Sequence, residues 1–304
     1  MHKRRISFSK AGAKVRSFDE TAKCFRNFFC LTRKNINFCA VKEAFSLVFF
    51  HIINNNCTKT KVMKRSLLLV AAALCSAAAL AQLNVQLHYD LGHDLYGSEL
   101  SNRPRLTATV ENYTPDAWGS TFFFIDADFG GHVVKSAYGE IARELKFWRA
   151  PIAAHIEYNG GLQRAAYGYD DAYLAGPAWN WASKDFSKTF SVQLMYKYMA
   201  HKQNHGGSSH GVQLTEVWGL QFARGLMTFS GYCDLWYDKG TSGRVVLMSE
   251  PQLWVNLYRL PRINEAAKWS IGTEWEISKN LVWPAEGAND KFYVIPTIAM
   301  KWTF

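Results

Sequence analysis

Carboxylates are the side chains of this protein best placed to do chemistry. Where apolar and polar residues alternate, carboxylates fall repeatedly on the polar positions, and a few basic residues join them. The acidic residues are Asp90, Glu111, Asp126, Asp128, Glu140, Glu144, Glu157, Asp234, Glu250, Glu274 and Glu276, and the basic ones are Lys146, Lys197, Lys301, His88 and His155. Packed carboxylates repel one another unless water, cations or basic side chains separate them. The pattern therefore favours a hydrated interior over a dry core.

Aromatic residues share these polar faces. Phe122 and Phe124 precede Asp126 at intervals of two residues. Aromatic rings can stack on bases or sugars, while carboxylates and amides accept hydrogen bonds from hydroxyl groups. The combination suits a neutral, polar, ring-bearing solute such as a nucleoside, and the alternative is a lumen wall without binding preference. The candidate ligand-binding or lumen-lining residues are Phe122, Phe124, Asp126, Asp128, Glu140, Glu144, His155, Glu157, Asp234, Trp236, Glu250, Gln252, Trp254, Glu274 and Glu276.

Enzyme and metal sites have weaker support. No nucleophile motif of the Gly-x-Ser-x-Gly type occurs in residues 82–304. His88 or His155 can each pair with a nearby acid, as in a hydrolytic barrel, but no spacing identifies a nucleophile. His201, His205 and His210 lie in a glycine- and serine-rich segment without a carboxylate frame. We therefore expect no enzymatic activity, no metal and no cofactor.

The segments that carry the candidate residues alternate with the period of two that is typical of β-strands. In residues 292–304, apolar and aromatic side chains occupy every second position up to the terminal Phe304, as in the closing strand of an outer-membrane barrel. The predicted strands are 83–91, 105–113, 119–129, 136–147, 152–159, 172–182, 188–200, 211–222, 226–237, 245–257, 268–278 and 292–304. This even number predicts an all-β fold, a twelve-stranded antiparallel transmembrane β-barrel with an up-and-down meander.

Alternation alone does not show which face of each strand points inward. A soluble barrel such as a lipocalin places its apolar residues inside, whereas a membrane barrel places them outside. Tryptophans near the predicted strand ends favour the second arrangement, because aromatic residues concentrate at membrane interfaces. These are Trp118, Trp148, Trp179, Trp181, Trp218, Trp283 and Trp302.

A secretory signal is present inside the chain and not at its first residue. Residues 63–81 begin Met-Lys-Arg, continue with a short apolar stretch and end Ala-Leu-Ala, which predicts cleavage before Gln82. A lipoprotein signal at Cys75 is disfavoured by the large Leu74 before it. We interpret residues 1–62 as a mistranslated upstream or disordered extension, the alternative being a basic, nucleic-acid-binding tail.

Charge and cysteine content support this division. The first 81 residues hold 15 of the 35 basic residues but only 3 of the 25 acidic ones, so residues 82–304 have 20 basic and 22 acidic residues. The high isoelectric point therefore gives no reason to expect nucleic-acid binding by residues 82–304. Only Cys233 follows Ala81, which excludes an internal disulfide in that part.

Several segments also resemble known families. Residues 120–129, with Asp126 and Asp128, and residues 137–144, with Glu140 and Glu144, resemble the paired strands of nucleoside-specific, Tsx-like outer-membrane porins. Residues 249–254, 271–276 and 296–304 resemble a Gram-negative outer-membrane barrel family that is distantly similar to those porins. The resemblance covers residues 82–304. It implies a monomeric barrel that passes nucleosides through a narrow lumen lined by Phe122, Phe124, Asp126, Asp128, Glu140 and Glu144.

The sequence thus predicts an outer-membrane protein that acts as a passive channel for small polar solutes, and the resemblance implies that nucleosides are among them. Its expected partners are outer-membrane lipid, the solute, and the barrel-assembly machinery that recognises Phe304, and we expect no nucleic acid. A barrel with a closed lumen that serves adhesion or envelope structure is the alternative, and an outer-membrane hydrolase is a less favoured one.

Overall fold

The computed structural model of the protein describes residues 82–130, 133–163, 169–200, 207–238, 244–263, 266, 268–282 and 291–304. The predicted extension 1–62 and the predicted signal peptide 63–81 lie outside the described residues. No helix of the described part is long and apolar enough to cross a membrane.

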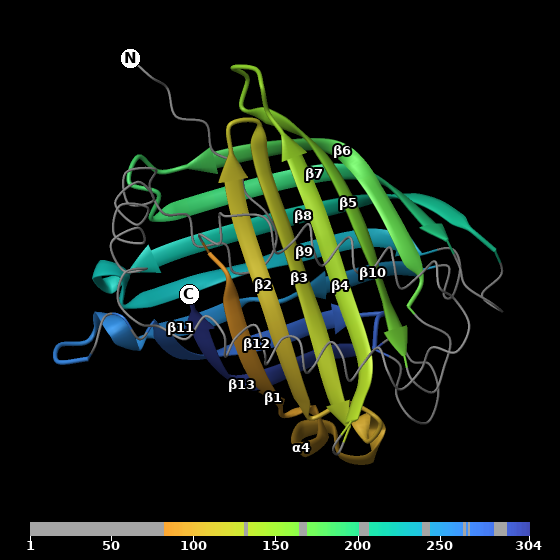
Figure 1. Ribbon diagram of the computed structural model, residues 1–304. Coiled ribbons are helices and arrows are strands. Elements are labelled where there is room, and N and C mark those ends of the chain that lie inside the picture. Colours follow the sequence, from red (N-terminus) through yellow and green to blue (C-terminus); the bar gives the residue numbers. More distant parts are fainter. Residues whose placement is uncertain are drawn as a thin grey trace, which may run out of the picture. The chain divides into compact units, whose positions relative to one another are not determined.

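The described strands form one closed antiparallel sheet (Figure 1). They are β1 (Asn84–Asp90), β2 (Leu106–Asp116), β3 (Gly119–Gly130), β4 (Val133–Leu145), β5 (Ile152–Gln163), β6 (Asp171–Ala182), β7 (Lys188–Ala200), β8 (Ser209–Phe222), β9 (Met227–Asp238), β10 (Arg244–Ser249), β11 (Gln252–Asn256), β12 (Trp269–Lys279) and β13 (Phe292–Thr303). Closure occurs at β13, which pairs with β12 on one side and with β1 on the other. The remaining strands pair in sequence order, which is the predicted meander.

β10 and β11 together make one strand of the barrel. Both lie between β9 and β12, and the register continues across the break, since Ser249 pairs with Cys233 and Gln252 pairs with Ser230. The break contains Pro251, which has no backbone N–H to donate to the sheet. Its carbonyl still accepts a hydrogen bond from the Trp275 N–H at 3.0 Å. The closed barrel therefore has twelve strands, and the predicted fold class is confirmed.

The two ends of the barrel differ in their connections. The turn end has the tight β2–β3, β4–β5, β6–β7 and β8–β9 connections, the last containing the short helix η2 (Ala223–Gly225). The longer β11–β12 connection, which contains η3 (Leu257–Arg259), is also at the turn end. At the loop end, the β1–β2 connection contains α4 (Gly92–Tyr96) and η1 (Gly97–Leu100). The β3–β4 connection at this end is short, as its sequence suggests.

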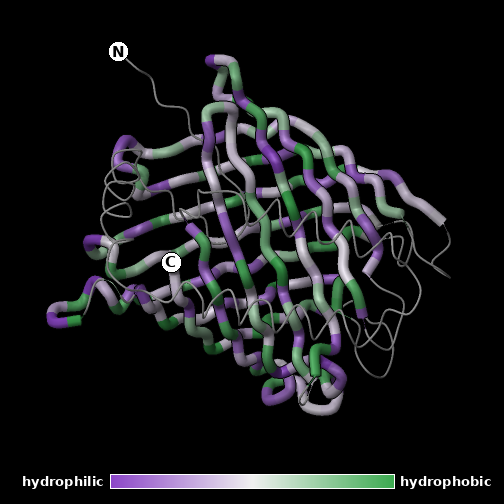
Figure 2. Tube along the Cα trace, in the orientation of Figure 1, coloured by the Kyte–Doolittle hydropathy of each residue, from purple (hydrophilic) through white to green (hydrophobic). Residues whose placement is uncertain are grey.

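Burial shows which face of each strand points inward. Along β7, Gln193 has no exposed surface, while the next residue, Leu194, is 54% exposed. Around the barrel, large apolar residues are exposed outside and polar residues are buried inside, and Figure 2 shows hydrophobic and hydrophilic residues alternating along the strands. Glu216 and Cys233, which pair across β8 and β9, are exceptions on the outer face. The arrangement is the reverse of that in a soluble barrel.

Aromatic residues gather where the strands end. At the turn end, the rings of Phe147 and Trp148 lie 4.6 Å apart between centroids, and Trp118 lies 6.4 Å from Phe147. Trp302 stacks on Trp269 at 5.6 Å, at the same end of β12 and β13. Trp283, which the sequence also places near a strand end, lies outside the described residues. These rings border the apolar outer surface as interfacial aromatic residues do in membrane barrels.

A charge in the middle of the outer face is expected to destabilise the barrel in lipid. Leu194→Lys, at the centre of β7, is expected to lower the free energy of unfolding by about 2–4 kcal/mol, because lysine is poorly solvated at the bilayer midplane. Phe222→Lys, at the last residue of β8, is expected to cost about 0–1 kcal/mol, because this residue lies near the interface. Denaturant unfolding from lipid vesicles, followed by tryptophan fluorescence, measures both, and equal costs contradict a lipid-facing exterior.

Candidate functional site

All fifteen candidate residues lie on the inner face of the barrel. They come from β3, β4, β5, β9, β11 and β12, with Glu250 in the break between β10 and β11. Phe122, Phe124, Glu144, His155, Glu157, Asp234, Gln252 and Trp254 are buried, whereas Asp126, Asp128, Glu140, Trp236, Glu250, Glu274 and Glu276 are partly exposed. The partly exposed residues lie in the half of the barrel toward the loop end and in its middle. In the half toward the turn end, interior side chains are almost fully buried.

On β2, β3 and β4, threonine, serine and tyrosine hydroxyls hold the interior carboxylates. Thr109 donates to Asp126 at 2.5 Å, and Thr107 donates to Asp128 at 2.7 Å. Both pairs follow from the antiparallel register, which sets each threonine opposite its aspartate. On β4, the Tyr138 hydroxyl donates to Glu140 at 3.0 Å. Sequence spacing placed these acids on one face, but only the register between strands identifies their donors.

A second polar network covers β1, β11, β12 and β13. The Gln252 amide donates to Glu274, and the Trp254 indole N–H donates to Gln252 at 2.9 Å. His88 lies 3.6 Å from Glu274 through its Nδ1 atom. The Lys301 ammonium lies 3.7 Å from the centre of the Trp254 ring, close enough for a cation–π interaction. The side chains of this network come from residues that are up to 213 positions apart in the sequence, from His88 to Lys301.

Arg103 belongs to this interior although it lies in the β1–β2 connection, and the sequence analysis did not include it. Its guanidinium donates to Asp90 at 2.7 Å and to Glu276 at 2.5 Å. Burial by itself lowers the pKa of Arg103, but attraction to Glu276 and Asp90 outweighs burial, and the net pKa is raised. Arg103 lies in a loop, where no strand periodicity marks its position. The only indication in the sequence was that the predicted lumen contains many more acidic than basic residues.

The same connection is anchored at the mouth of the barrel by apolar contacts. Leu100 of η1 is buried against the inward-facing Tyr293 and Ile295 of β13. The Tyr293 hydroxyl donates to Glu99 at 2.6 Å, and the Lys291 ammonium lies 2.8 Å from the same carboxylate. Residues 91–105 therefore fold over the part of the mouth next to β1, β12 and β13, which narrows the loop end.

His155 is enclosed by acids in the half of the barrel toward the turn end. Its ring nitrogens lie 3.4 Å from Glu144 and 3.0 Å from Glu157, and Asn180 donates to Glu144 at 3.1 Å. Both ring nitrogens thus face carboxylates, which leaves none for a nucleophile. For His88, Glu274 and the Thr297 hydroxyl both face the Nδ1 atom. A nucleophile and an acid must contact opposite nitrogens of a catalytic histidine, so neither histidine has the geometry of a hydrolytic triad.

The interior has a marked excess of acidic groups. The eleven carboxylates that the sequence placed on this face are opposed by the permanent positive charges of Arg103, Lys197 and Lys301. Lys197 donates to Gln213 at 2.7 Å and lies 4.0 Å from the Trp236 ring centre. Lys146, which the sequence also assigned to this face, lies just beyond the end of β4. Among the described residues, no group of three or more histidine, cysteine, aspartate or glutamate side chains is arranged to hold a metal ion.

Comparison with known proteins identifies the family of this chain. Residues 81–304 match the family described as "Domain of unknown function (DUF5020)". No curated protein matches the chain. Among solved structures, a NanC porin in a rhombohedral crystal form is similar at 10% sequence identity and a TM-score of 0.45, covering 73% of this chain and 98% of that chain. A likeness this distant carries no statement about function.

Removal of the Arg103 charge is expected to destabilise the loop end of the barrel. A charged hydrogen bond contributes about 1.5–3 kcal/mol, so Arg103→Met is expected to lower the free energy of unfolding by at least about that amount. A double-mutant cycle with Glu276→Gln is expected to give a coupling of about 0.5–3 kcal/mol, measured by denaturant unfolding.

Arg105→Met is the matched control for Arg103→Met. Arg105 lies in the same connection, but its ion-pair partner Asp94 is exposed and 3.5 Å away. A smaller effect is therefore expected. If Arg105→Met costs as much as Arg103→Met, the buried ion pairs do not anchor the connection.

Proposed function

We propose that this chain, which belongs to the DUF5020 family, is a passive channel of the outer membrane for small polar solutes. The observation that carries the proposal is the combination of an apolar exterior with a polar, acidic interior in a closed barrel. Lipid tolerates a spanning sheet only when closure satisfies every backbone hydrogen bond and apolar side chains face outward. A closed sheet and an apolar exterior are both present here, and together with the predicted signal peptide they support a location in the outer membrane.

The charge of the lumen decides which solutes the channel favours. Asp128, Asp234, Glu274 and their neighbours give the inner wall a negative potential that attracts cations and repels anions. We therefore propose a narrow pathway that passes cations and neutral polar molecules more readily than anions.

Nucleosides are the solute class that the family resemblance suggests. In support, the Phe124 ring lies 6.0 Å from Tyr138, and the Tyr138 ring lies 5.3 Å from Tyr169, next to the carboxylates of β3 and β4. Such rings can stack on a base while Asp126 or Glu140 accepts hydrogen bonds from a ribose. This solute identity belongs to the proposal and rests on these aromatic neighbours.

A second candidate function is supported by the tight filling of the half toward the turn end. Ser120, Ala153, Ala178, Gln193 and Ser270 are at most 1% exposed on the inner faces of their strands. Twelve strands lie between barrels that side chains fill and barrels with an open channel, so a closed barrel with a structural or adhesive role is physically reasonable. The two candidates differ in whether solute passes.

Planar bilayers test the channel. We expect discrete conductance steps with a preference for K⁺ over Cl⁻, and Glu274→Gln is expected to lower that preference by roughly a factor of two because one lumen charge is lost. Glu216→Gln removes an equal charge from the outer face and is the matched control, expected to leave selectivity unchanged. Absence of conductance by the folded wild type supports the closed barrel instead.

Adenosine tests the nucleoside proposal separately. A nucleoside that enters the lumen displaces water and ions while it resides there, so millimolar adenosine is expected to reduce the conductance steps. Mannitol at the same concentration controls for viscosity. If neither adenosine nor mannitol changes the conductance, nucleoside binding in the lumen is excluded, but the channel function is not.

A further inference from the structure

One sector of the interior has buried polar atoms that no protein group satisfies. On β5–β9, six inward-facing side chains carry a buried nitrogen or oxygen without a hydrogen-bond partner. They are Asn159, Asn180, Ser191, Gln193, Ser230 and Trp236. Gln193 is the extreme case, since neither its amide oxygen nor its amide nitrogen has a partner and the residue has no exposed surface.

The opposite sector of the barrel is different. On β1, Gln86 donates to Asn84 at 2.8 Å, and Asn84 donates to Glu111 on β2 at 3.0 Å. On β11 and β12, Ser270 donates to Asn256 at 2.9 Å. These buried polar groups satisfy one another, in contrast to Ser191, Gln193 and Ser230.

Three of the unsatisfied side chains, Ser191, Gln193 and Ser230, belong to a strip whose own residues carry no charge. Its residues, here called the neutral strip, are Thr189, Ser191 and Gln193 on β7, Gly219 on β8, and Thr228 and Ser230 on β9. The strand register makes it continuous, since Gly219 pairs with Thr189 on one side and with Ser230 on the other. Glycine has no side chain, so no side chain separates the two hydroxyl-bearing residues. The nearest charged residues on the inner faces of β7 and β9 are Lys197 and Asp234, and Asp234 lies level with Gln193 across Thr215 of β8.

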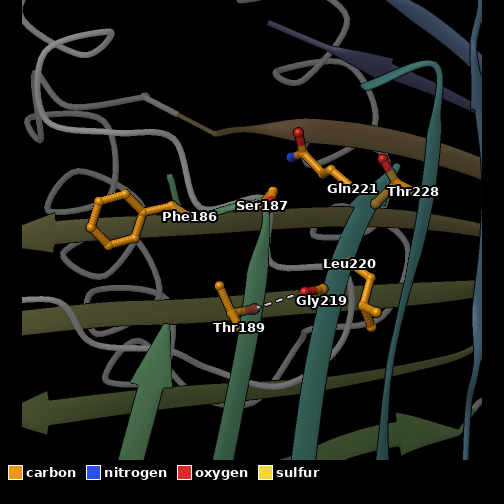
Figure 3. A pocket seen from close by; sticks show the side chains of 7 residues that line it. All are labelled: Phe186, Ser187, Thr189, Gly219, Leu220, Gln221 and Thr228. Carbon is orange, nitrogen blue, oxygen red and sulfur yellow. Dashed lines mark hydrogen bonds between the residues drawn. The ribbon is translucent and has the colours of Figure 1, made fainter. Parts of the chain in front are cut away.

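The strip begins at a pocket at the turn end of the barrel. Figure 3 shows the residues that line it, which include Ser187, Thr189, Gly219, Gln221 and Thr228. The Thr189 hydroxyl donates to the Gly219 carbonyl at 3.4 Å, a long bond that a closer acceptor can replace. Hydroxyl groups thus lead from solvent at the turn end to Ser191, Ser230 and Gln193.

A buried polar group without a partner costs about 1–3 kcal/mol, so proteins rarely keep several in one place without water or a ligand to satisfy them. Serine hydroxyls and a primary amide together offer donors and acceptors but no charge. An ion on this strip would lose hydration without gaining a counter-charge. A neutral solute with several hydroxyl groups, each of which donates and accepts, complements the strip instead.

We infer that the neutral strip is the binding track for neutral polyhydroxy solutes, which cross the turn half of the barrel along β7–β9 by replacing water on Ser191, Gln193 and Ser230. This inference rests on the proposed channel function and adds the solute class and the wall that it follows. A free polyol and the ribose of a nucleoside share this chemistry. Cations follow the carboxylates of the opposite sector and do not need the strip.

Uptake into proteoliposomes tests the inference, with radiolabelled erythritol and radiolabelled uridine as the probes and K⁺ conductance as the independent readout. Gln193→Leu keeps the side-chain volume but removes both amide groups, and Ser191→Ala is the smaller second change. Met195→Leu is the matched control, because Met195 is an equally buried inward-facing residue two positions along β7. Heat-dependent migration on gels verifies that each variant is a folded barrel.

We expect Gln193→Leu to lower uptake of erythritol, uridine or both by about fivefold or more, because one or two neutral hydrogen bonds to the solute are lost. K⁺ conductance of this variant is expected to equal that of the wild type. Met195→Leu is expected to change neither uptake nor conductance. Uptake of erythritol identifies a free polyol as the solute, and uptake of uridine identifies a nucleoside. Uptake by Gln193→Leu equal to wild type, or reduced only in proportion to conductance, overturns the inference. Wild type that conducts K⁺ but takes up neither probe also overturns it and leaves the channel intact. If the wild type neither conducts K⁺ nor takes up either probe, both the inference and the proposed channel function are overturned.

Discussion

Closure of the sheet at β13 is the constraint on which the rest of the structure depends. Because β13 pairs with both β12 and β1, the described sheet has no free edge, and every strand must present one face inward and one outward. The alternation of side chains then separates the two environments without any helix or second layer. A shift of one residue in any strand would exchange its faces, placing carboxylates outside and aliphatic residues inside. The polar interior thus exists only because the register is fixed around the whole barrel.

Two kinds of polar surface result inside the barrel. Around β1, β2, β11 and β12, acids and amides are held by neighbours such as Thr109, Trp254 and Arg103, so this sector is rigid and negatively charged. Around β7–β9, Ser191 and Gln193 are equally buried but lack protein partners. A satisfied network stabilises one arrangement, whereas unsatisfied groups depend on water or solute. We therefore infer that the sector around β1, β2, β11 and β12 supports the barrel, whereas the sector around β7–β9 contacts the solute.

The fold alone does not decide the function, because closed barrels of similar size can be filled or open. In this chain, the partial exposure of Glu250 and Glu274 favours passage of solute, and the complete burial of residues such as Ala178 and Ser270 favours a closed lumen. The β1–β2 connection adds a further constriction through Leu100 and Arg103.

The sequence by itself determined the strands, their number and the grouping of the acids, because a period of two is a local property that any strand expresses. It assigned Asp126, Glu140 and Glu274 to one face, and the structure places them on the inner one. Its alternation alone did not reveal which face is inner, and only the tryptophans near the strand ends indicated it, since inward and outward faces differ only after the sheet closes. It also missed Arg103, whose role depends on Glu276, 173 positions away. Contacts between distant strands arise from closure and register, so only the tertiary structure decides them.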